Sequence, residues 1–212
     1  MSTTLTLDGL VRWLDSFRAR IDENTAYLTE LDSAIGDADH GSNMARGMAA
    51  VMEKVGAAPA ATADELFKTV GMTLVTSVGG ASGPLYGTFF LRFGMSAGPA
   101  TECDGAALAA ALRAGLEGVV ARGKAEAGDK TMFDALSPAL EAMDAAVASG
   151  ASLAEATAAA RDAAATGRDA TAPLVARKGR ASYLRERSAG HLDPGATSTA
   201  LLFDALAEVA AA

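Results

Sequence analysis

The apolar residues of this chain recur at helical spacing, and almost no stretch alternates as a strand does. Leu10, Trp13, Leu14, Phe17 and Ile21 follow one another at intervals of three or four residues, which is the period of one helix face. Aromatic residues make up only 5% of the chain, whereas alanine is abundant throughout. Because small side chains let helices pack closely, the sequence predicts an all-α protein.

The same spacing predicts eight successive helices. We expect them over residues 7–31, 43–55, 63–78, 84–96, 104–122, 131–148, 152–178 and 194–211. Pro84 and Pro194 suit first helical positions, and Pro138 is expected to kink the sixth helix. The seventh is expected to break near Gly167 or Pro173. No linker is long enough to divide the chain, so residues 1–212 are predicted to form a single domain.

Charge and cysteine content exclude several classes of protein. The net charge is −8 and no basic stripe is present, which argues against direct binding of nucleic acid. Cys103 is the only cysteine, so neither an intrachain disulfide nor a thiolate zinc site is expected. We find no leader over residues 1–17 and no long apolar run without charges. We therefore expect a cytoplasmic protein without a membrane span.

Three aspartates, Asp32, Asp37 and Asp39, lie within eight residues. Asp37 and Asp39 flank a single residue, so in an extended chain both side chains would point the same way. Three carboxylates held this close repel one another unless a cation lies among them, and oxygen-only ligands favour a hard ion such as Mg²⁺. The alternative is that these aspartates only form turns and caps.

Gly41, Ser42 and Asn43 follow this cluster directly and open the next helix. The free N–H groups at the start of a helix can hold an anion. A metal site beside anion-binding backbone indicates a phosphate ester as the ligand, and we expect a nucleotide. A negative net charge does not forbid such a ligand, because a bound metal ion can invert the local charge.

Alternate connections between helices should meet at one end of an up-and-down bundle. The odd-numbered connections contain glycine and polar residues, and they span residues 32–43, 79–84, 123–131 and 179–195. The even-numbered connections are plainer and span residues 57–62, 97–103 and 149–151. The helices that follow the odd connections would bring their N-termini together, each with unpaired N–H groups and a partial positive charge.

Single residues in these connections allow two interpretations each. Ser82 can cap a helix or bind phosphate, in a glycine-rich segment that lacks the lysine of a P-loop. Lys130 can neutralise phosphate or remain a solvated surface residue. Met132 can pack against a purine or belong to the core. Arg180 can bind phosphate through two N–H groups or pair with Glu186 at the surface.

The remaining candidates are Asp193 and the two histidines. Asp193 precedes Pro194 and Gly195, which makes capping its expected role and a hydrogen bond to ribose a secondary one. His40 and His191 are most often structural, with a phosphohistidine or general base as the alternative. His40 adjoins the aspartates, so we expect it to orient the loop or contact nucleotide.

The chain resembles the DhaL family, the nucleotide-binding subunits of bacterial dihydroxyacetone kinases that depend on the phosphotransferase system. Five ordered groups of motifs carry the resemblance and span nearly the whole chain. They cover residues 36–41, 77–84, 122–126, 128–132 and, as one group, 179–184 with 190–198.

The resemblance implies a barrel of eight antiparallel helices with the nucleotide site at one end. It implies two Mg²⁺ ions held by Asp32, Asp37 and Asp39, and ADP or ATP as the nucleotide. The positions that match nucleotide contacts are His40, Gly41, Ser42, Asn43, Ala81, Ser82, Gly123, Met132, Arg180, Asp193, Pro194 and Gly195.

The resemblance also implies a phosphotransferase that works with partners. ADP would stay bound as a coenzyme, and a phosphohistidine on a DhaM-like carrier subunit would convert it to ATP. The γ-phosphoryl group would then pass to dihydroxyacetone on a DhaK-like subunit. The alternatives are an ATP-dependent kinase domain with exchangeable nucleotide and a nucleotide-sensing protein that binds a transcriptional regulator.

Overall fold

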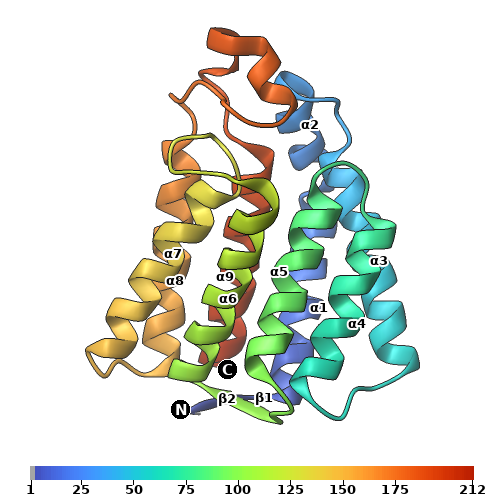
Figure 1. The fold of residues 1–212 in the computed structure, drawn as a ribbon, viewed down its shortest axis with the longest axis vertical. Coiled ribbons are helices and arrows are strands. Elements are labelled where there is room, and N and C mark those ends of the chain that lie inside the picture. The colour runs from blue at the N-terminus through green and yellow to red at the C-terminus, as the bar shows by residue number, and fades with distance from the viewer. Residues whose placement is uncertain (1–2) are drawn as a thin grey trace.

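A computed structural model describes residues 3–212, and helices make up most of them (Figure 1). The helices are α1 Leu7–Glu23, α2 Thr25–Ile35, α3 His40–Ala57, α4 Ala63–Ser77, α5 Ser82–Ala97, α6 Gly105–Gly123, α7 Phe133–Ala148, α8 Leu153–Ala170, the 3₁₀ segment η1 Arg180–Ser188 and α9 Pro194–Ala211. Two short strands, β1 Thr4–Thr6 and β2 Glu102–Asp104, complete the fold. The prediction of a mostly helical protein is confirmed.

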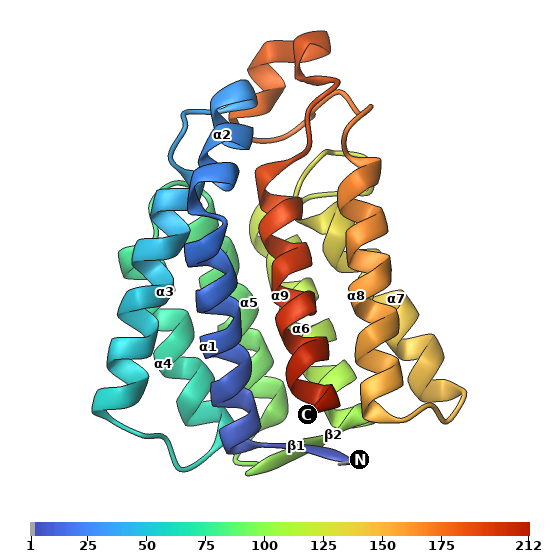
Figure 2. The same ribbon diagram turned by 180° about the vertical axis from the view of Figure 1, so that it is seen from behind.

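The long helices follow one another in space in the order they have in the chain. From α3 to α9 each helix packs on the next, and α1 packs on both α3 and α9. Figures 1 and 2 show these helices along the long axis of the molecule, with α2 and η1 at one end. The antiparallel pair of β1 and β2 lies at the opposite end. The odd-numbered and the even-numbered connections between helices therefore lie at opposite ends of the molecule.

The first predicted helix is wrong as a single element, because the chain breaks at Asn24. The backbone there has φ −102° and ψ 10°, and the Asn24 side-chain amide donates to the carbonyl oxygen of Arg20 at 2.8 Å. Asparagine side chains compete with the helix for backbone partners in this way. The second piece, α2, runs to Ile35 and therefore contains Asp32 in its last turn.

Two other predicted boundaries differ from the structure by three residues or more. The second predicted helix begins at His40 rather than at residue 43. The seventh ends at Ala170 rather than at residue 178, and part of the expected loop forms η1. No break occurs at Gly167, which instead lets α8 approach α7, since a Cβ there would lie 2.2 Å from the carbonyl oxygen of Asp134. Helix α7 continues through Pro138.

The main core centres on aromatic rings from α1, α4 and α5. Trp13 is fully buried, and the centroid of its ring lies 5.7–6.1 Å from those of Phe67, Phe90 and Phe93. Its indole Nε1 donates to the carbonyl oxygen of Leu202 on α9 at 3.0 Å. The ring contacts join α1 to α4 and α5, and the hydrogen bond joins the first helix of the chain to the last one.

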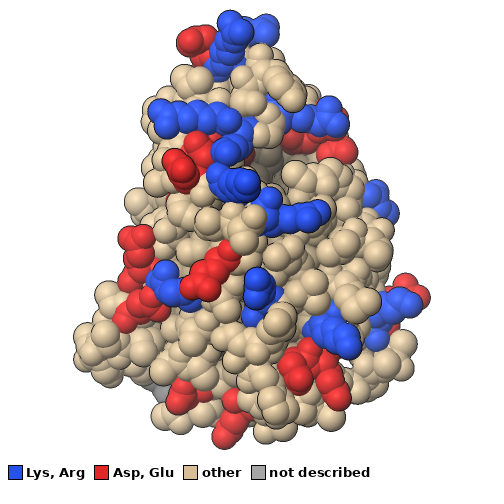
Figure 3. Space-filling view, viewed as in Figure 1, with Lys and Arg blue, Asp and Glu red and all other residues tan. Residues whose placement is uncertain are grey.

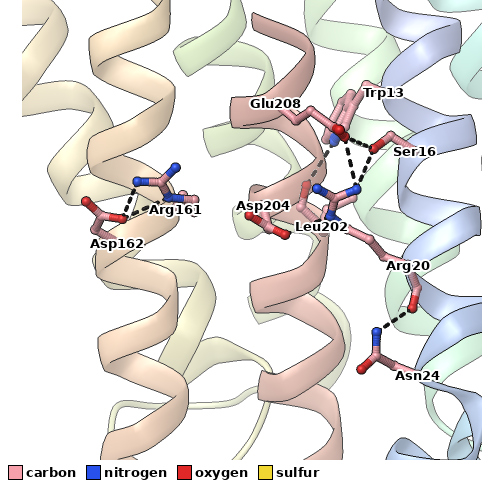
Figure 4. Close-up of polar contacts among 9 residues, drawn as sticks. All are labelled: Trp13, Ser16, Arg20, Asn24, Arg161, Asp162, Leu202, Asp204 and Glu208. Atoms are coloured by element: carbon pink, nitrogen blue, oxygen red, sulfur yellow. Dashed lines mark hydrogen bonds and ion pairs between the residues drawn. The ribbon is translucent and has the colours of Figure 1, made fainter. Parts of the chain in front are cut away.

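The outer side of the contact between α1 and α9 is polar (Figure 4). The Arg20 guanidinium lies 2.7 Å from a carboxylate oxygen of Asp204 and 3.0 Å from one of Glu208. The hydroxyl of Ser16 also donates to Glu208, at 2.6 Å. Because both carboxylates are exposed to solvent, we expect these pairs to contribute little to stability.

A second and much smaller apolar cluster lies apart from the main core. It contains Ile35, Ala176 and Ala181, with Leu184 packed against them. These residues come from the end of α2, the segment before η1, and η1 itself, so the cluster holds η1 to α2. In the described part of the chain, no helix is long and apolar enough to cross a membrane.

Candidate functional site

The three aspartates converge at the end of the molecule where α2 and η1 lie. One carboxylate oxygen from each of Asp32, Asp37 and Asp39 lies within 4.8 Å of the other two. The expected extended backbone is wrong, because Ala38 between Asp37 and Asp39 has a left-handed φ of 61°. A tight turn, rather than strand geometry, therefore brings the carboxylates together.

Asp32 also fixes the start of α3. Its Oδ2 accepts the backbone N–H groups of Asp39 at 2.8 Å and His40 at 3.1 Å. The capping interpretation of the aspartates is thus correct for Asp32. From its position in α2, this residue satisfies free N–H groups at the start of α3. The carboxylate oxygens of Asp32, Asp37 and Asp39 together offer an oxygen-only donor set, which fits a hard divalent cation.

A cavity of about 520 Å³ adjoins the aspartates, within the size range of small-molecule sites. The N-terminal ends of α3, α5, α7 and α9 all contribute to its lining, as predicted from the parity of the connections. Twelve of the predicted site residues line it: Asp32, Asp37, Asp39, His40, Ala81, Ser82, Gly123, Met132, Arg180, Asp193, Pro194 and Gly195. Their contact with a ligand stays a prediction.

Gly41, Ser42 and Asn43 are not among the residues that line the cavity. A Cβ on Gly41 would lie 2.1 Å from the carbonyl oxygen of Thr25, so this glycine permits the close packing of α3 on α2. The hydroxyl of Ser42 donates to the carbonyl oxygen of Asp39 at 3.0 Å. Asn43 is buried and its side-chain oxygen accepts a hydrogen bond from Arg46.

Basic side chains surround this end of the molecule, although the chain as a whole is acidic. Arg122, Lys178 and Arg180 line the cavity, and Figure 3 shows lysine and arginine side chains gathered over the same end. Arg180 pairs with Asp37 at 3.0 Å, rather than with Glu186 as the alternative had it. The combination of carboxylates, helix N-termini and guanidinium groups suits a metal-bound phosphate.

His40 lies in a buried network of hydroxyl groups. Its Nδ1 lies 3.1 Å from Ser82 Oγ and its Nε2 lies 2.9 Å from Ser198 Oγ. Ser198 donates to the carbonyl oxygen of Gly195 at 3.1 Å, so it accepts from Nε2, and Ser82 donates to Nδ1. Burial lowers the pKa of His40. A neutral imidazole with both nitrogens occupied favours the structural interpretation over a phosphohistidine or a general base.

Tyr86 extends this network, and the sequence analysis did not identify it. Its hydroxyl lies 2.8 Å from Ser198 Oγ and 3.2 Å from Thr199 Oγ1. Burial raises the pKa of Tyr86 to about 12, so the phenol remains protonated. No sequence signal marked this tyrosine, because its partners lie more than 100 residues away along the chain.

The pKa of Asp193 gives a prediction for stability. Asp193 caps α9 by accepting the N–H of Ala196 at 2.7 Å. Its pKa is raised from 3.8 to about 7, chiefly by burial; the charges of Asp134 and Asp32 act in the same direction, whereas the Ala196 bond and Lys130 act against it. The folded state therefore keeps a proton that the unfolded chain releases. The contribution of Asp193 to stability should fall as the pH rises from about 4 to about 7.

Asp193→Asn should remove this pH-dependent part of the stability, because the asparagine side chain can accept the same N–H without titrating. The measurement is the free energy of unfolding by urea across that pH range for both proteins, without nucleotide. We expect the variant to lose less stability than the parent between the two ends of the range. Parallel profiles would contradict the assignment.

The chain is similar to known proteins along most of its length. The sequence profile of the DAK2 domain matches residues 34–208. The chain is 46% identical over 207 residues to the PTS-dependent dihydroxyacetone kinase, ADP-binding subunit DhaL, of Lactococcus lactis, covering 98% of this chain and 100% of that protein. It is 44% identical over 204 residues to the PEP-dependent dihydroxyacetone kinase, ADP-binding subunit DhaL, of Escherichia coli, covering 96% and 97%.

A solved structure also resembles the whole chain. It is the dihydroxyacetone kinase of C. freundii in complex with AMP-PNP and Mg²⁺, with a TM-score of 0.72 and 30% sequence identity. The match covers 93% of this chain but 33% of that one, so the chain corresponds to about a third of that kinase.

Proposed function

This chain belongs to the DAK2 domain family, as a subunit of the DhaL type, and from that premise we propose that its cavity holds ADP as the coenzyme of a dihydroxyacetone kinase. One observation carries the proposal. Three carboxylate oxygens within 4.8 Å of one another adjoin a cavity of about 520 Å³ that four helix N-termini help to line. This combination suits a nucleoside diphosphate whose phosphates are bridged to protein by Mg²⁺.

The activity we propose is that of a phosphotransferase in a relay. A phosphohistidine on a DhaM-like carrier gives its phosphoryl group to the β-phosphate of ADP, breaking a P–N bond and forming a P–O bond. The γ-phosphoryl group of the resulting ATP then passes to a hydroxyl of dihydroxyacetone on a DhaK-like subunit. The relatives named DhaL match this chain over nearly their whole length, which supports the role of a separate subunit.

The described residues divide the work of phosphoryl transfer. Asp32, Asp37 and Asp39 would hold two Mg²⁺ ions, which supply charge neutralisation for the phosphates. Arg180 and the helix N-termini position the phosphates, which is most of what phosphoryl transfer needs from a protein. The nucleotide contacts that we propose are His40, Gly41, Ser42, Asn43, Ala81, Ser82, Gly123, Met132, Arg180, Asp193, Pro194 and Gly195. Of these, Gly41, Ser42 and Asn43 would act through the backbone at the start of α3.

We also infer the finer architecture. The neighbour order of α1 and α3 to α9, which returns to α1, supports a closed barrel of eight antiparallel helices. Residues 1–212 then form one domain, with α2 and η1 at its ligand-binding end. A transcriptional regulator as a further partner stays a prediction.

Native mass spectrometry of the purified protein tests the proposal. We expect a mass increase that corresponds to one ADP and two Mg²⁺ ions, and its loss after treatment with EDTA. Protein that is free of nucleotide and shows no Mg²⁺-dependent ADP binding would overturn the proposed function.

A second experiment separates the relay from an ATP-dependent kinase with exchangeable nucleotide. The protein is loaded with isotopically labelled ADP and then allowed to turn over with its partner subunits and unlabelled ADP in solution. Retention of the label through many turnovers is expected for a coenzyme. Loss of the label at the rate of turnover would favour the exchanging kinase.

A further inference from the structure

Lys130 is a buried cation that the proposed phosphate chemistry does not use. The residue is only 1% exposed, so it is not a solvated surface lysine, although it belongs to the lining of the cavity. The Nζ atom donates to the backbone carbonyl oxygens of Thr171 at 2.8 Å, Leu174 at 3.1 Å and Ala172 at 3.3 Å, and to that of His191. Four carbonyl oxygens thus surround one ammonium group.

These carbonyls belong to two loops, and Lys130 itself belongs to a third. The loops also bond to one another around the ammonium group. Arg177 N–H donates to the carbonyl oxygen of Asp129 at 3.0 Å, and Gly190 N–H donates to that of Ala172 at 2.7 Å. The N–H of Asp193 donates to Thr171 Oγ1 at 3.0 Å. The ammonium group therefore lies at the junction of three loops.

Each of the three loops continues directly into residues that line the cavity. Lys130 lines the cavity itself, together with Thr131 and Met132. Asp193 follows His191 by two residues, and Lys178, Gly179 and Arg180 lie at the end of the loop after α8. These residues approach the cavity from α7, α9 and η1, elements that are distant in sequence. Their mutual placement depends on whatever holds the three loops together.

Burying the charge of Lys130 and holding its backbone in a left-handed conformation both cost free energy. We infer that the cation is needed at this position. Burial lowers the pKa of Lys130, and the Asp193 carboxylate acts in the opposite direction. The backbone of Lys130 is left-handed, with φ 62°, a conformation that is unfavourable for a residue with a Cβ. Converging carbonyl dipoles repel one another, and a cation among them removes that repulsion.

We propose that Lys130 is a positioning residue for the nucleotide site, whose ammonium group fixes its own loop to two others by binding their backbone carbonyls and touches no phosphate. The identity of the ligand in this inference rests on the proposed function, whereas the role of Lys130 in fixing the three loops does not. The inference also explains why Lys130 lines the cavity while its ammonium group binds backbone carbonyls of the protein.

Lys130→Met keeps most of the side-chain volume and removes the ammonium group. Hydrogen exchange in nucleotide-free protein is measured at the amides of Arg177, Gly190 and Asp193. Leaving buried carbonyls without a donor should speed exchange at these amides about tenfold or more, with amides of α1 unchanged. The affinity for ADP with Mg²⁺ should fall by about the same factor. Lys68→Met, on the exposed face of α4, is the matched control and should change neither quantity.

The outcomes distinguish this inference from the proposed function. Unchanged exchange at the three amides in a folded variant would overturn the role of Lys130. Faster exchange in a protein whose parent binds no ADP would leave that role intact and overturn the ligand. Faster exchange with unchanged ADP affinity would overturn the link between loop order and binding.

If Lys130→Met does not fold, nuclear magnetic resonance of the parent protein, labelled with ¹⁵N-lysine and with ¹³C at the backbone carbonyls, tests the inference. We expect one ammonium signal that exchanges slowly with water and shows couplings across hydrogen bonds to backbone carbonyl carbons. A set of lysine ammonium signals that all exchange rapidly, as exposed ones do, would overturn the inference.

Discussion

Asp37→Asn is expected to weaken Mg²⁺-dependent binding of ADP by about 100-fold or more while the fold remains intact. Replacing groups that only support metal ligands costs about 10–100-fold in metal affinity, and loss of a ligand itself should cost at least as much. Asp37 is exposed and pairs only with Arg180 in the described structure, so its neutralisation removes charge without disturbing the core. Isothermal titration with ADP, with and without Mg²⁺, measures the effect.

Arg180→Gln is the matched control, because it breaks the same ion pair and leaves all three carboxylates in place. We expect this variant to bind Mg²⁺ normally and to lose only the part of ADP affinity that its guanidinium supplies. If Asp37→Asn binds ADP and Mg²⁺ as the parent does, the three aspartates do not form the metal site.

Trp13→Ala is expected to destabilise the protein by about 3–5 kcal/mol, as other large-to-small aromatic substitutions in cores do. The substitution removes ring contacts with three phenylalanines from α4 and α5 and the hydrogen bond to Leu202 on α9. It also opens a cavity where α1 meets the other helices. The free energy of unfolding, measured with urea, checks this value.

Two further variants separate the causes of this loss. Trp13→Phe keeps an aromatic ring and leaves the Leu202 carbonyl without its indole donor, so we expect a loss of about 1–3 kcal/mol. Tyr183→Ala removes an aromatic ring that is 83% exposed and should change stability by less than about 0.5 kcal/mol. A loss in Trp13→Ala no larger than that of Tyr183→Ala would contradict the described core.

Local sequence was sufficient for the parts of the site that are close together in the chain. Asp32, Asp37 and Asp39 were correctly grouped, because eight residues leave little room for them to separate. The order of the helices placed Ser82, Met132 and Asp193 at one cavity. The parity of the connections carries this information, since each helix reverses the direction of the chain.

Contacts between distant segments were not predictable in the same way. For Lys130 the sequence allows a phosphate ligand or a surface residue, because nothing near it in sequence reveals the carbonyls of Thr171 and His191. The pairing of β1 with β2 joins residues about 100 positions apart, and strands of three residues give no periodic signal. The break at Asn24 was missed because the apolar spacing continues across it.

The small cluster of Ile35, Ala176 and Ala181 has a consequence for how a ligand enters and leaves. These residues attach η1 and its Arg180 to α2 without contributing to the main core. A segment with so little apolar contact of its own can detach locally while the remaining helices stay folded. The residence time of a bound molecule would then depend on the free energy needed to detach η1 from α2. Substitutions in the aromatic core would leave that time unaltered.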